Sequence, residues 1–278
     1  MLAVSGTNTS PEMGMPKNSI LLNCFGRGGS SLLWNAIGSS PAVLLPEKEW
    51  HQGVFGDQHL FRKAMSHLAN FSEIGWIPGV HGMCHRGMRA AIPEKEFLDK
   101  PSASFVVIKL MDRQLAFREI IKRNFSLTRE IVLTRHPIPM CEGLMRSGHS
   151  VESAAKWYRS ATRHMLAALR DCAALAVSFE SLVENPKEVL KKTYGWLGIP
   201  TPRDECVQVK EKGYGAARSS DADMATGRFI RVPLDRLSEM FDSTVNQKAA
   251  GRLSGFQREA LWALTGSLAS ELGYTREV

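Results

Sequence analysis

The stretch GRGGSS at residues 26–31, between an apolar run and a helical pattern, combines residue types from which anion sites are built. Glycines let the backbone approach a ligand closely, and the N–H groups at the start of a helix attract negative charge. The hydroxyls of Ser30 and Ser31 can donate hydrogen bonds, and Arg27 adds a fixed charge. The alternative is an ordinary turn with Ser31 as the helix N-cap. We predict an anion site formed by Arg27, Gly28, Gly29, Ser30 and Ser31.

This loop lacks the lysine of the nucleotide-kinase loop, which reads G-x-x-x-x-G-K-[ST]. Gly29 is followed by Ser30, and the basic residue Arg27 comes before the last two glycines. Without that lysine the loop holds the terminal phosphate of ATP poorly, and a phosphate that carries a sulfuryl group fits better. A kinase that phosphorylates a small metabolite remains an alternative function, and the missing lysine counts against it.

A second chemical candidate is Lys109, which lies near the end of the apolar run VVIKLMD at residues 106–112. A charge in a buried strand costs free energy unless it faces a site. We expect Lys109 to bind a transferred group or its acceptor. The alternative is a lysine that extends to solvent from the strand edge.

Apolar runs and helical patterns alternate along the chain, and these elements must position the candidate residues. Strands are predicted at residues 19–25, 42–45, 104–111, 130–135 and 174–182, and helices at 30–38, 151–169, 187–197 and 256–272. Near-continuous apolar strands between helices are typical of a parallel sheet covered on both faces. We therefore predict a three-layer α/β fold, in which ligands bind at the carboxyl ends of the strands.

Residues 18–278 are predicted to form a single domain after a flexible polar leader at residues 1–17. Two irregular segments, 50–103 and 211–236, are expected to fold over the carboxyl edge of the sheet and to cover acceptor and cofactor. The first contains a predicted helix at residues 59–70 and the sequence HGMCH at 81–85. Because no second ligand set accompanies HGMCH, we predict no metal site there.

The bulk composition narrows the class of partner and the compartment. A net charge of +7 suits a polyanionic small ligand, and the absence of any block of five like charges disfavours nucleic acid. The five scattered cysteines favour a reduced, cytoplasmic setting. No apolar run approaches the roughly 18 residues of a membrane span, and the first residues do not follow the pattern of a signal peptide.

Four segments resemble sulfotransferases that use 3′-phosphoadenosine 5′-phosphosulfate (PAPS). The sequence FGRGGSSLL at 25–33 resembles their 5′-phosphosulfate loop, commonly G-x-[RK]-[SG]-G-[ST]-[ST]-x-L. The other three are AVLLPEKEWHQGVF at 42–55, IVLTRHPIPMCEG at 131–143 and LAVSFESLVENPKEVLKKTYGWLGIP at 175–200. Together they span most of residues 19–200, whereas the last 70 residues match only loosely.

The resemblance implies a fold like that of the P-loop nucleotide kinases and transfer of a sulfuryl group from PAPS to a hydroxyl or amine. The transfer would be in line and would need no metal. The backbone of residues 27–31 would hold the phosphosulfate, and Arg27 would neutralise charge on the bridging oxygen. The implied acceptor is a small molecule, a lipid or a carbohydrate.

The resemblance also implies a catalytic base soon after the first helix. Glu49 occupies that position, and Lys48 beside it would polarise the site or lower the pKa of the carboxylate. Glu47 and His51 are rival bases within one turn. The alternative is a solvated charged loop.

For the 3′-phosphate, the resemblance points to Arg135 at the end of its strand, because arginine binds such a dianion bidentately. The serine that usually follows eight residues later is replaced by Gly143, with Cys141 and Ser147 nearby. A structural Arg135 paired with a carboxylate is the alternative. Since that serine is missing, a module that binds the nucleotide without turning it over stays open.

A late basic segment completes the predicted donor site. Arg218, Ser219 and Lys212 would close over the 3′-phosphate, although a plain basic surface explains them as well. Arg218, Ser219 and Ser147 are therefore included with Arg135 among the expected donor-binding residues. Glu180, in SFESL, is expected to connect the sheet to a helix cap and not to react.

Overall fold

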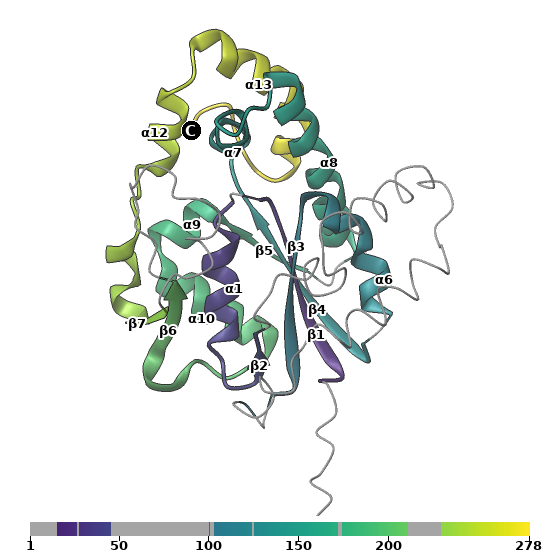
Figure 1. Ribbon diagram of the computed structural model, residues 1–278, viewed down its shortest axis with the longest axis vertical. Helices are drawn as coiled ribbons and strands as arrows, with labels where there is room; N and C mark the ends of the chain where they lie inside the picture. The colour runs from purple at the N-terminus through teal and green to yellow at the C-terminus, as the bar shows by residue number, and fades with distance from the viewer. Residues whose placement is uncertain are drawn as a thin grey trace, which may run out of the picture.

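The computed structural model describes residues 16–26, 28–45, 100, 103–123, 125–171, 174–210 and 229–278. Within these residues a five-stranded parallel sheet has the strand order β2-β3-β1-β4-β5 (Figure 1). The strands are β1 (Asn18–Cys24), β2 (Val43–Leu44), β3 (Phe105–Met111), β4 (Leu127–Thr134) and β5 (Ala174–Ser178). The predicted α/β fold with a central parallel sheet is confirmed.

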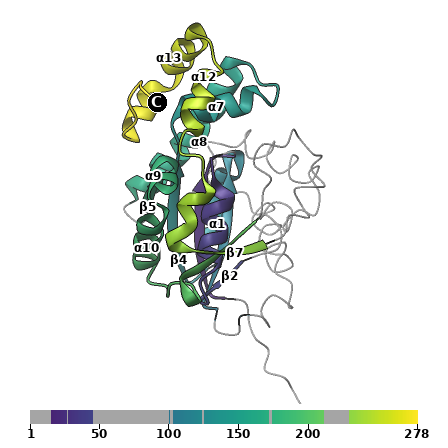
Figure 2. The same cartoon turned by 90° about the vertical axis from the view of Figure 1, so that its left-hand side faces the viewer.

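Each face of the sheet packs against its own helices because side chains alternate between the faces along a strand. On one face Leu21 and Val132 share a core with α6 (Arg118–Lys122), α7 (Pro137–Met145), α8 (Val151–Arg170) and α13 (Gly255–Glu271). On the other, Leu22 and Ile131 pack with α1 (Ser30–Gly38) and α10 (Pro186–Leu197). Figure 2 shows α1 in front of the sheet in this view.

Shorter elements complete the described part of the chain. The strands β6 (Cys206–Lys210) and β7 (Phe229–Pro233) form an antiparallel pair. The remaining helices are α9 (Phe179–Glu184) and α12 (Val245–Gly251), with 3₁₀ turns η1 (Asp112–Phe117), η2 (Arg203–Glu205) and η3 (Leu234–Met240).

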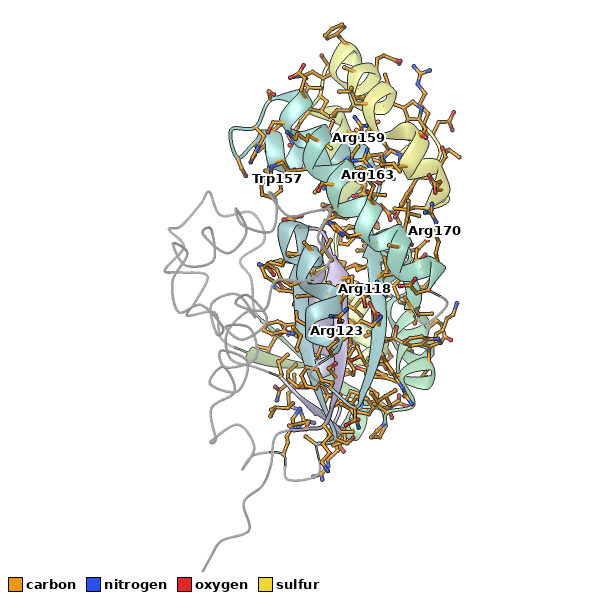
Figure 3. The ribbon with its side chains drawn as sticks, turned by 90° about the vertical axis from the view of Figure 1, so that its right-hand side faces the viewer. Arg118, Arg123, Trp157, Arg159, Arg163 and Arg170 are labelled. Atoms are coloured by element: carbon orange, nitrogen blue, oxygen red, sulfur yellow. The ribbon has the colours of Figure 1, made fainter. Side chains whose placement is uncertain are left out.

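Helix α8 illustrates how the sequence produces an element. The Ser150 hydroxyl accepts the N–H of Ser153, at 3.2 Å, and so caps the helix start. Ala154, Tyr158, Ala161 and Met165, at helical spacing, form its buried stripe. Arginines lie along the other side, where Figure 3 labels Arg159, Arg163 and Arg170.

Three helices stand over one end of the sheet. Helix α7 begins at Pro137, directly after β4 and residues 135–136, so this end is the carboxyl edge of the parallel strands. Helices α12 and α13 both pack against α7, and Figures 1 and 2 show the three grouped at this end. Segments distant in the sequence therefore meet where a ligand would bind.

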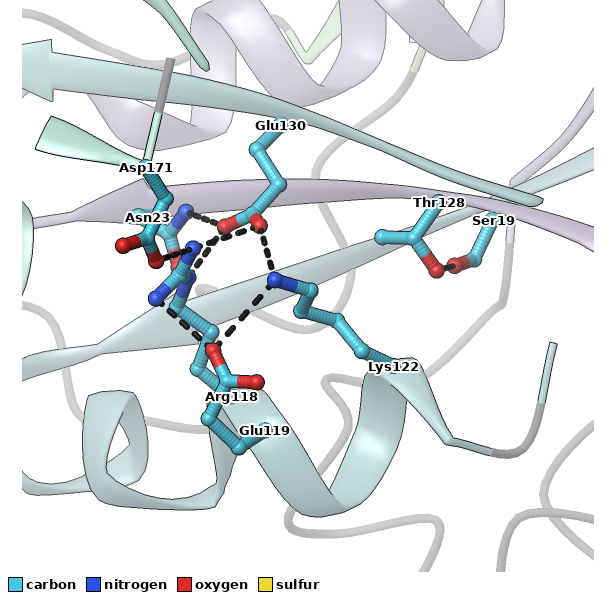
Figure 4. A network of polar contacts seen from close by, with 8 residues as sticks. All are labelled: Ser19, Asn23, Arg118, Glu119, Lys122, Thr128, Glu130 and Asp171. Atoms are coloured by element: carbon cyan, nitrogen blue, oxygen red, sulfur yellow. Dashed lines mark hydrogen bonds and ion pairs between the residues drawn. The ribbon is translucent and has the colours of Figure 1, made fainter. Parts of the chain in front are cut away.

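A buried ion network lies under the sheet, between β4 and α6 (Figure 4). Glu130 is 1% exposed and accepts hydrogen bonds from Arg118, at 2.5 and 2.8 Å, and from the Asn23 amide, at 3.0 Å. Arg118 also reaches Asp171, at 2.8 Å, and Lys122 approaches Glu130 at 3.2 Å. The bidentate Arg118–Glu130 pair satisfies both buried charges.

Two predicted boundaries were wrong. The strand expected at 174–182 ends at Ser178, whose hydroxyl accepts the N–H of Ser181 at 3.1 Å and so starts α9. Part of the segment 211–236, expected to be irregular, is ordered: β7 pairs with β6, and η3 begins at Leu234. Apolar β7 side chains such as Val232 pack in the core, which the local sequence did not reveal.

Several expectations fall outside the described residues. These include nearly all of the leader at 1–17, the helix at 59–70 and the sequence HGMCH at 81–85. Among the described helices, none is both long and apolar enough to cross a membrane.

Candidate functional site

The carboxyl edge of the sheet brings together residues that follow four strands. The glycine-rich loop follows β1, Asp112 follows β3, Arg135 follows β4 and Phe179 follows β5. Because β1 lies between β3 and β4, the loop is central among these residues. The candidate site is built at this edge.

Gly29 gives the loop its shape at the start of α1. It has φ 82°, a left-handed conformation that favours glycine, and it caps the helix without a side-chain hydrogen bond. A Cβ atom at Gly29 would lie 2.3 Å from Cδ2 of Phe179, so a side chain does not fit there. Within the described part of the chain, no acceptor is present for the N–H groups of Gly29, Ser30 and Ser31. These amides can bind an anion.

Two earlier amides of the loop are used within the protein. The N–H of Gly28 donates to the carbonyl oxygen of Phe25, at 3.2 Å, and the N–H of Gly26 donates to Oδ1 of Asp112, at 3.1 Å. Asp112 itself has φ 51°, a left-handed conformation that is uncommon for residues other than glycine. These contacts fix the loop against the end of β3, so the described loop amides that could bind an anion are those that begin α1.

Arg135 is held almost entirely within the protein. It is 8% exposed, and its Nε and Nη2 donate to Oδ1 of Asn246, at 3.0 and 2.8 Å. Its guanidinium lies 4.3 Å from the centre of the Phe179 ring, a cation–π contact. Burial lowers the pKa of Arg135, although the charge of Glu180 acts in the opposite direction. The charged form is therefore poorly solvated at this position.

Glu180 lies behind Asn246 and joins three segments. Its Oε1 accepts the amide Nδ2 of Asn246, at 2.7 Å, and the N–H of His136, at 3.1 Å. Its Oε2 accepts the hydroxyl of Tyr274, at 2.9 Å. The predicted structural role of Glu180 at a helix start agrees with these contacts, because His136 is the N-cap of α7.

The His136 ring is neutral in this arrangement. Its Nδ1 accepts the N–H of Ile138, at 3.2 Å, so its Nε2 carries the proton and donates to the carbonyl oxygen of Thr275, at 2.9 Å. Burial lowers the pKa of His136, against smaller effects of the Thr275 hydrogen bond and Glu180. The ring therefore fixes the start of α7 and the last residues of the chain against each other.

Phe179 connects the two halves of the site. One part of its ring faces Gly29, and the guanidinium of Arg135 stacks on the same ring. The start of α1 and the guanidinium of Arg135 therefore both lie against the ring of Phe179. This geometry suits a ligand with two anionic groups a short distance apart.

Lys109 lies away from solvent, on the face of the sheet that α1 covers. It is 2% exposed, and its Nζ lies 5.0 Å from the centre of the Trp34 ring. The alternative in which this lysine extends to solvent is not supported. The side chain therefore lies beside α1, the helix that begins after the glycine-rich loop.

Ser147 lies at the other end of α7 from Arg135. It is exposed, and its hydroxyl donates to the carbonyl oxygen of Gly143, at 3.2 Å. The structure therefore does not bring Ser147 together with Arg135. Gly143 and Cys141 are buried within the helix.

The other predicted site residues fall outside the described residues: Arg27, Glu47, Lys48, Glu49, His51, Lys212, Arg218 and Ser219. Their predicted roles stay predictions. In the described ranges no group of His, Cys, Asp and Glu is arranged to hold a metal ion.

Sequence reasoning missed Asn246, Tyr274 and Asp112. Asp112 directly follows a predicted strand, and that position alone marks it as an edge residue. Asn246 and Tyr274 have no local signal, because each reaches the site from a helix or tail far from Arg135 in the sequence. Only the tertiary fold reveals them.

Two solved structures are similar over nearly the whole chain. The sulfotransferase domain from the Synechococcus PCC 7002 olefin synthase has 20% sequence identity and a TM-score of 0.54, covering 95% of this chain and 98% of that chain. The sulfotransferase domain from the curacin biosynthetic pathway has 16% identity and a TM-score of 0.55, covering 92% and 97%. No protein-family model and no curated protein matches the sequence. At these identities the similarity shows that the chain has the fold of these sulfotransferase domains.

Proposed function

We propose that this protein is a sulfotransferase, which moves a sulfuryl group from PAPS to a hydroxyl or amine of a small-molecule, lipid or carbohydrate acceptor. One observation carries the proposal: the ring of Phe179 lies against both Gly29, beside the amides that can bind an anion, and the buried guanidinium of Arg135. PAPS has anionic groups on both the 5′ and the 3′ positions of one ribose. Shared fold with two sulfotransferase domains supports the same reading.

In this proposal the donor spans the carboxyl edge of the sheet. The amides of Gly29, Ser30 and Ser31, with Arg27 and Gly28, surround the 5′-phosphosulfate. Arg135 binds the 3′-phosphate, and Arg218 and Ser219 close over it. Ser147 belongs to this set only if the far end of α7 also reaches the donor.

The chemical step is a single in-line displacement. The acceptor gives its proton to Glu49, and its oxygen or nitrogen forms a bond to sulfur while the bond from sulfur to the bridging oxygen breaks. Adenosine 3′,5′-bisphosphate leaves with the electron pair of that bond, and Arg27 neutralises the developing charge. Lys48 tunes Glu49, and the buried Lys109 holds the sulfuryl group or the acceptor. The reaction needs no metal.

The proposal also assigns the remaining segments. Residues 18–278 act as a single domain, in which 50–103 choose the acceptor and 211–236 cover the cofactor. We place the activity in the cytoplasm, because the five scattered cysteines favour a reduced setting and Cys141 is a buried thiol outside any disulfide.

Ligand-induced stabilisation tests the donor directly. PAPS or adenosine 3′,5′-bisphosphate without metal should raise the melting temperature of the pure protein, because a ligand that binds only the folded state stabilises it. A shift with Mg²⁺ and ATP alone would instead identify a kinase.

A second step tests the base. Glu49→Gln should abolish sulfuryl transfer and leave the PAPS-induced shift intact. Activity that survives in this variant would assign the base to Glu47 or His51. A wild-type protein that binds PAPS but transfers nothing to any acceptor tested would be a binding module.

A further inference from the structure

We infer that Asn246, Glu180 and Tyr274 are positioning residues that hold the Arg135 guanidinium ready for the 3′-phosphate of the donor. The inference rests on the proposed function. None of the three touches the reacting atoms, so their effect is confined to the 3′ end of the donor. We call these three residues the arginine brace.

The first step is the orientation of the Asn246 amide. Asn246 is 6% exposed, and its Nδ2 donates to Oε1 of Glu180, at 2.7 Å. Because that end of the amide is a donor, Oδ1 must point the other way, where it accepts both Nε and Nη2 of Arg135. Glu180 thus selects the amide orientation that holds the arginine.

The second step is charge. A carboxylate in the place of Asn246 would neutralise the guanidinium directly, as a buried ion pair does. The amide oxygen of Asn246 is neutral, so it fixes the direction of Arg135 and preserves its attraction for a dianion. The residue type at position 246 therefore matches a site that must be both rigid and positive.

The third step ties the brace to the end of the described chain. The Tyr274 hydroxyl donates to Oε2 of Glu180, at 2.9 Å, and lies 2.9 Å from Oγ1 of Thr134 at the end of β4. Burial and then the charge of Glu180 raise the pKa of Tyr274, so the hydroxyl keeps its proton and remains a donor. The tail after α13 thereby fixes the carboxylate that orients Asn246.

The test compares two nucleotides that differ only at the 3′ position. Adenosine 3′,5′-bisphosphate has the 3′-phosphate and adenosine 5′-phosphate lacks it, so the ratio of their dissociation constants isolates the contribution of that group. Asn246→Ala should weaken bisphosphate binding by about 10- to 100-fold, the range for a charge-assisted contact, and leave monophosphate binding within about twofold. Isothermal titration calorimetry measures both.

Three further variants sharpen the result. Tyr274→Phe should lower the ratio by a smaller factor, because it removes one of the contacts of Glu180. Asn246→Asp keeps an acceptor for Arg135 but adds negative charge, so it should bind the bisphosphate no better than Asn246→Ala. Gln247→Ala, an exposed neighbour on α12, is the matched control and should leave the ratio unchanged.

The outcomes separate the inference from the proposed function. A wild-type protein with no preference for the bisphosphate would overturn the PAPS donor itself. A normal wild-type preference that Asn246→Ala leaves unchanged would overturn the brace alone. Equal weakening of both nucleotides in Asn246→Ala would reduce the brace to general stability and also overturn the inference, as would wild-type binding by Asn246→Asp.

Discussion

Arg118 and Arg135 are both buried, but the protein surrounds the two guanidinium groups with different partners. Arg118 sits under the sheet and makes a bidentate pair with Glu130, with Asp171 beside it. Arg135 lies at the carboxyl edge, where its Nε and Nη2 donate to the neutral amide oxygen of Asn246. The Glu180 carboxylate accepts a hydrogen bond from the other end of that amide.

The pKa of Arg118 is raised and that of Arg135 is lowered, because burial is offset to different extents at the two sites. Burial disfavours the charged form of both, but at Arg118 the hydrogen bonds to Glu130 and Asp171 outweigh it and raise the pKa. At Arg135 burial prevails and lowers the pKa. The carboxylate contacts of Arg118 stabilise its charge within the fold, whereas Arg135 is bound by the neutral amide oxygen of Asn246. The contrast agrees with a structural role for Arg118 and with the proposed donor-binding role of Arg135.

The largest expected effect is on stability, at the structural arginine. Glu130→Ala leaves Arg118 buried without its main partner and should lower the free energy of unfolding by about 3–5 kcal/mol. Urea denaturation measures the loss, and Glu130→Gln is a milder version if the alanine variant does not fold. Affinity for adenosine 3′,5′-bisphosphate in the folded fraction should stay near the wild-type value. A loss below about 1 kcal/mol would contradict the structural role.

An intermediate effect is expected where the two halves of the site meet. Gly29→Ala forces a Cβ into the Phe179 ring and adds a left-handed alanine, which alone costs about 1–3 kcal/mol. The variant should also bind adenosine 5′-phosphate about tenfold more weakly, because the added side chain displaces the loop amides. Gly195→Ala in α10 is the control, since no atom lies within 4 Å of its added Cβ. Equal affinities in the two variants would remove Gly29 from the site.

The smallest expected effect is a pH dependence near Arg135. Since burial holds the pKa of folded His136 below its unfolded value near 6.5, the unfolded state binds the proton first as pH falls. The contribution of His136 to the free energy of unfolding is therefore fully present above about pH 6.5. It declines below that pH, by at most about 1.4 kcal/mol per pH unit. His136→Gln should flatten the decline between about pH 6.5 and 5 relative to wild type in urea titrations. Parallel curves would show that His136 does not titrate differently in the two states.

The sequence predicts much of the fold and of the candidate site, but not the partners of the two arginines. The glycine-rich loop, the strand before Arg135 and the helix at 151–169 follow from local patterns, and the structure has them with shifts of one or a few residues at the ends. The end of β5 at Ser178 could not be predicted, because the apolar residues of FESL at 179–182 are compatible with either a strand or a helix. The Ser178 hydroxyl, which accepts the N–H of Ser181, ends the strand and starts the helix.

The environment of each arginine is the part that local patterns cannot reach. Nothing around Arg118 or Arg135 in the sequence tells which will meet a carboxylate and which an amide. Glu130 comes from a neighbouring strand, and Asn246 comes from a helix more than a hundred residues after Arg135. Partner identity is a property of the folded chain.

The central place of β1 in the sheet also bears on how the protein is made. This strand pairs with residues 105–111 on one side and 127–133 on the other, so it has no lasting neighbours when it leaves the ribosome. Pairings between such distant segments form slowly. The glycine-rich loop precedes both of these partner strands in the chain, so we expect it to gain its final shape only after the nascent chain has extended past β4. A nucleotide present before that point would have no formed loop to bind.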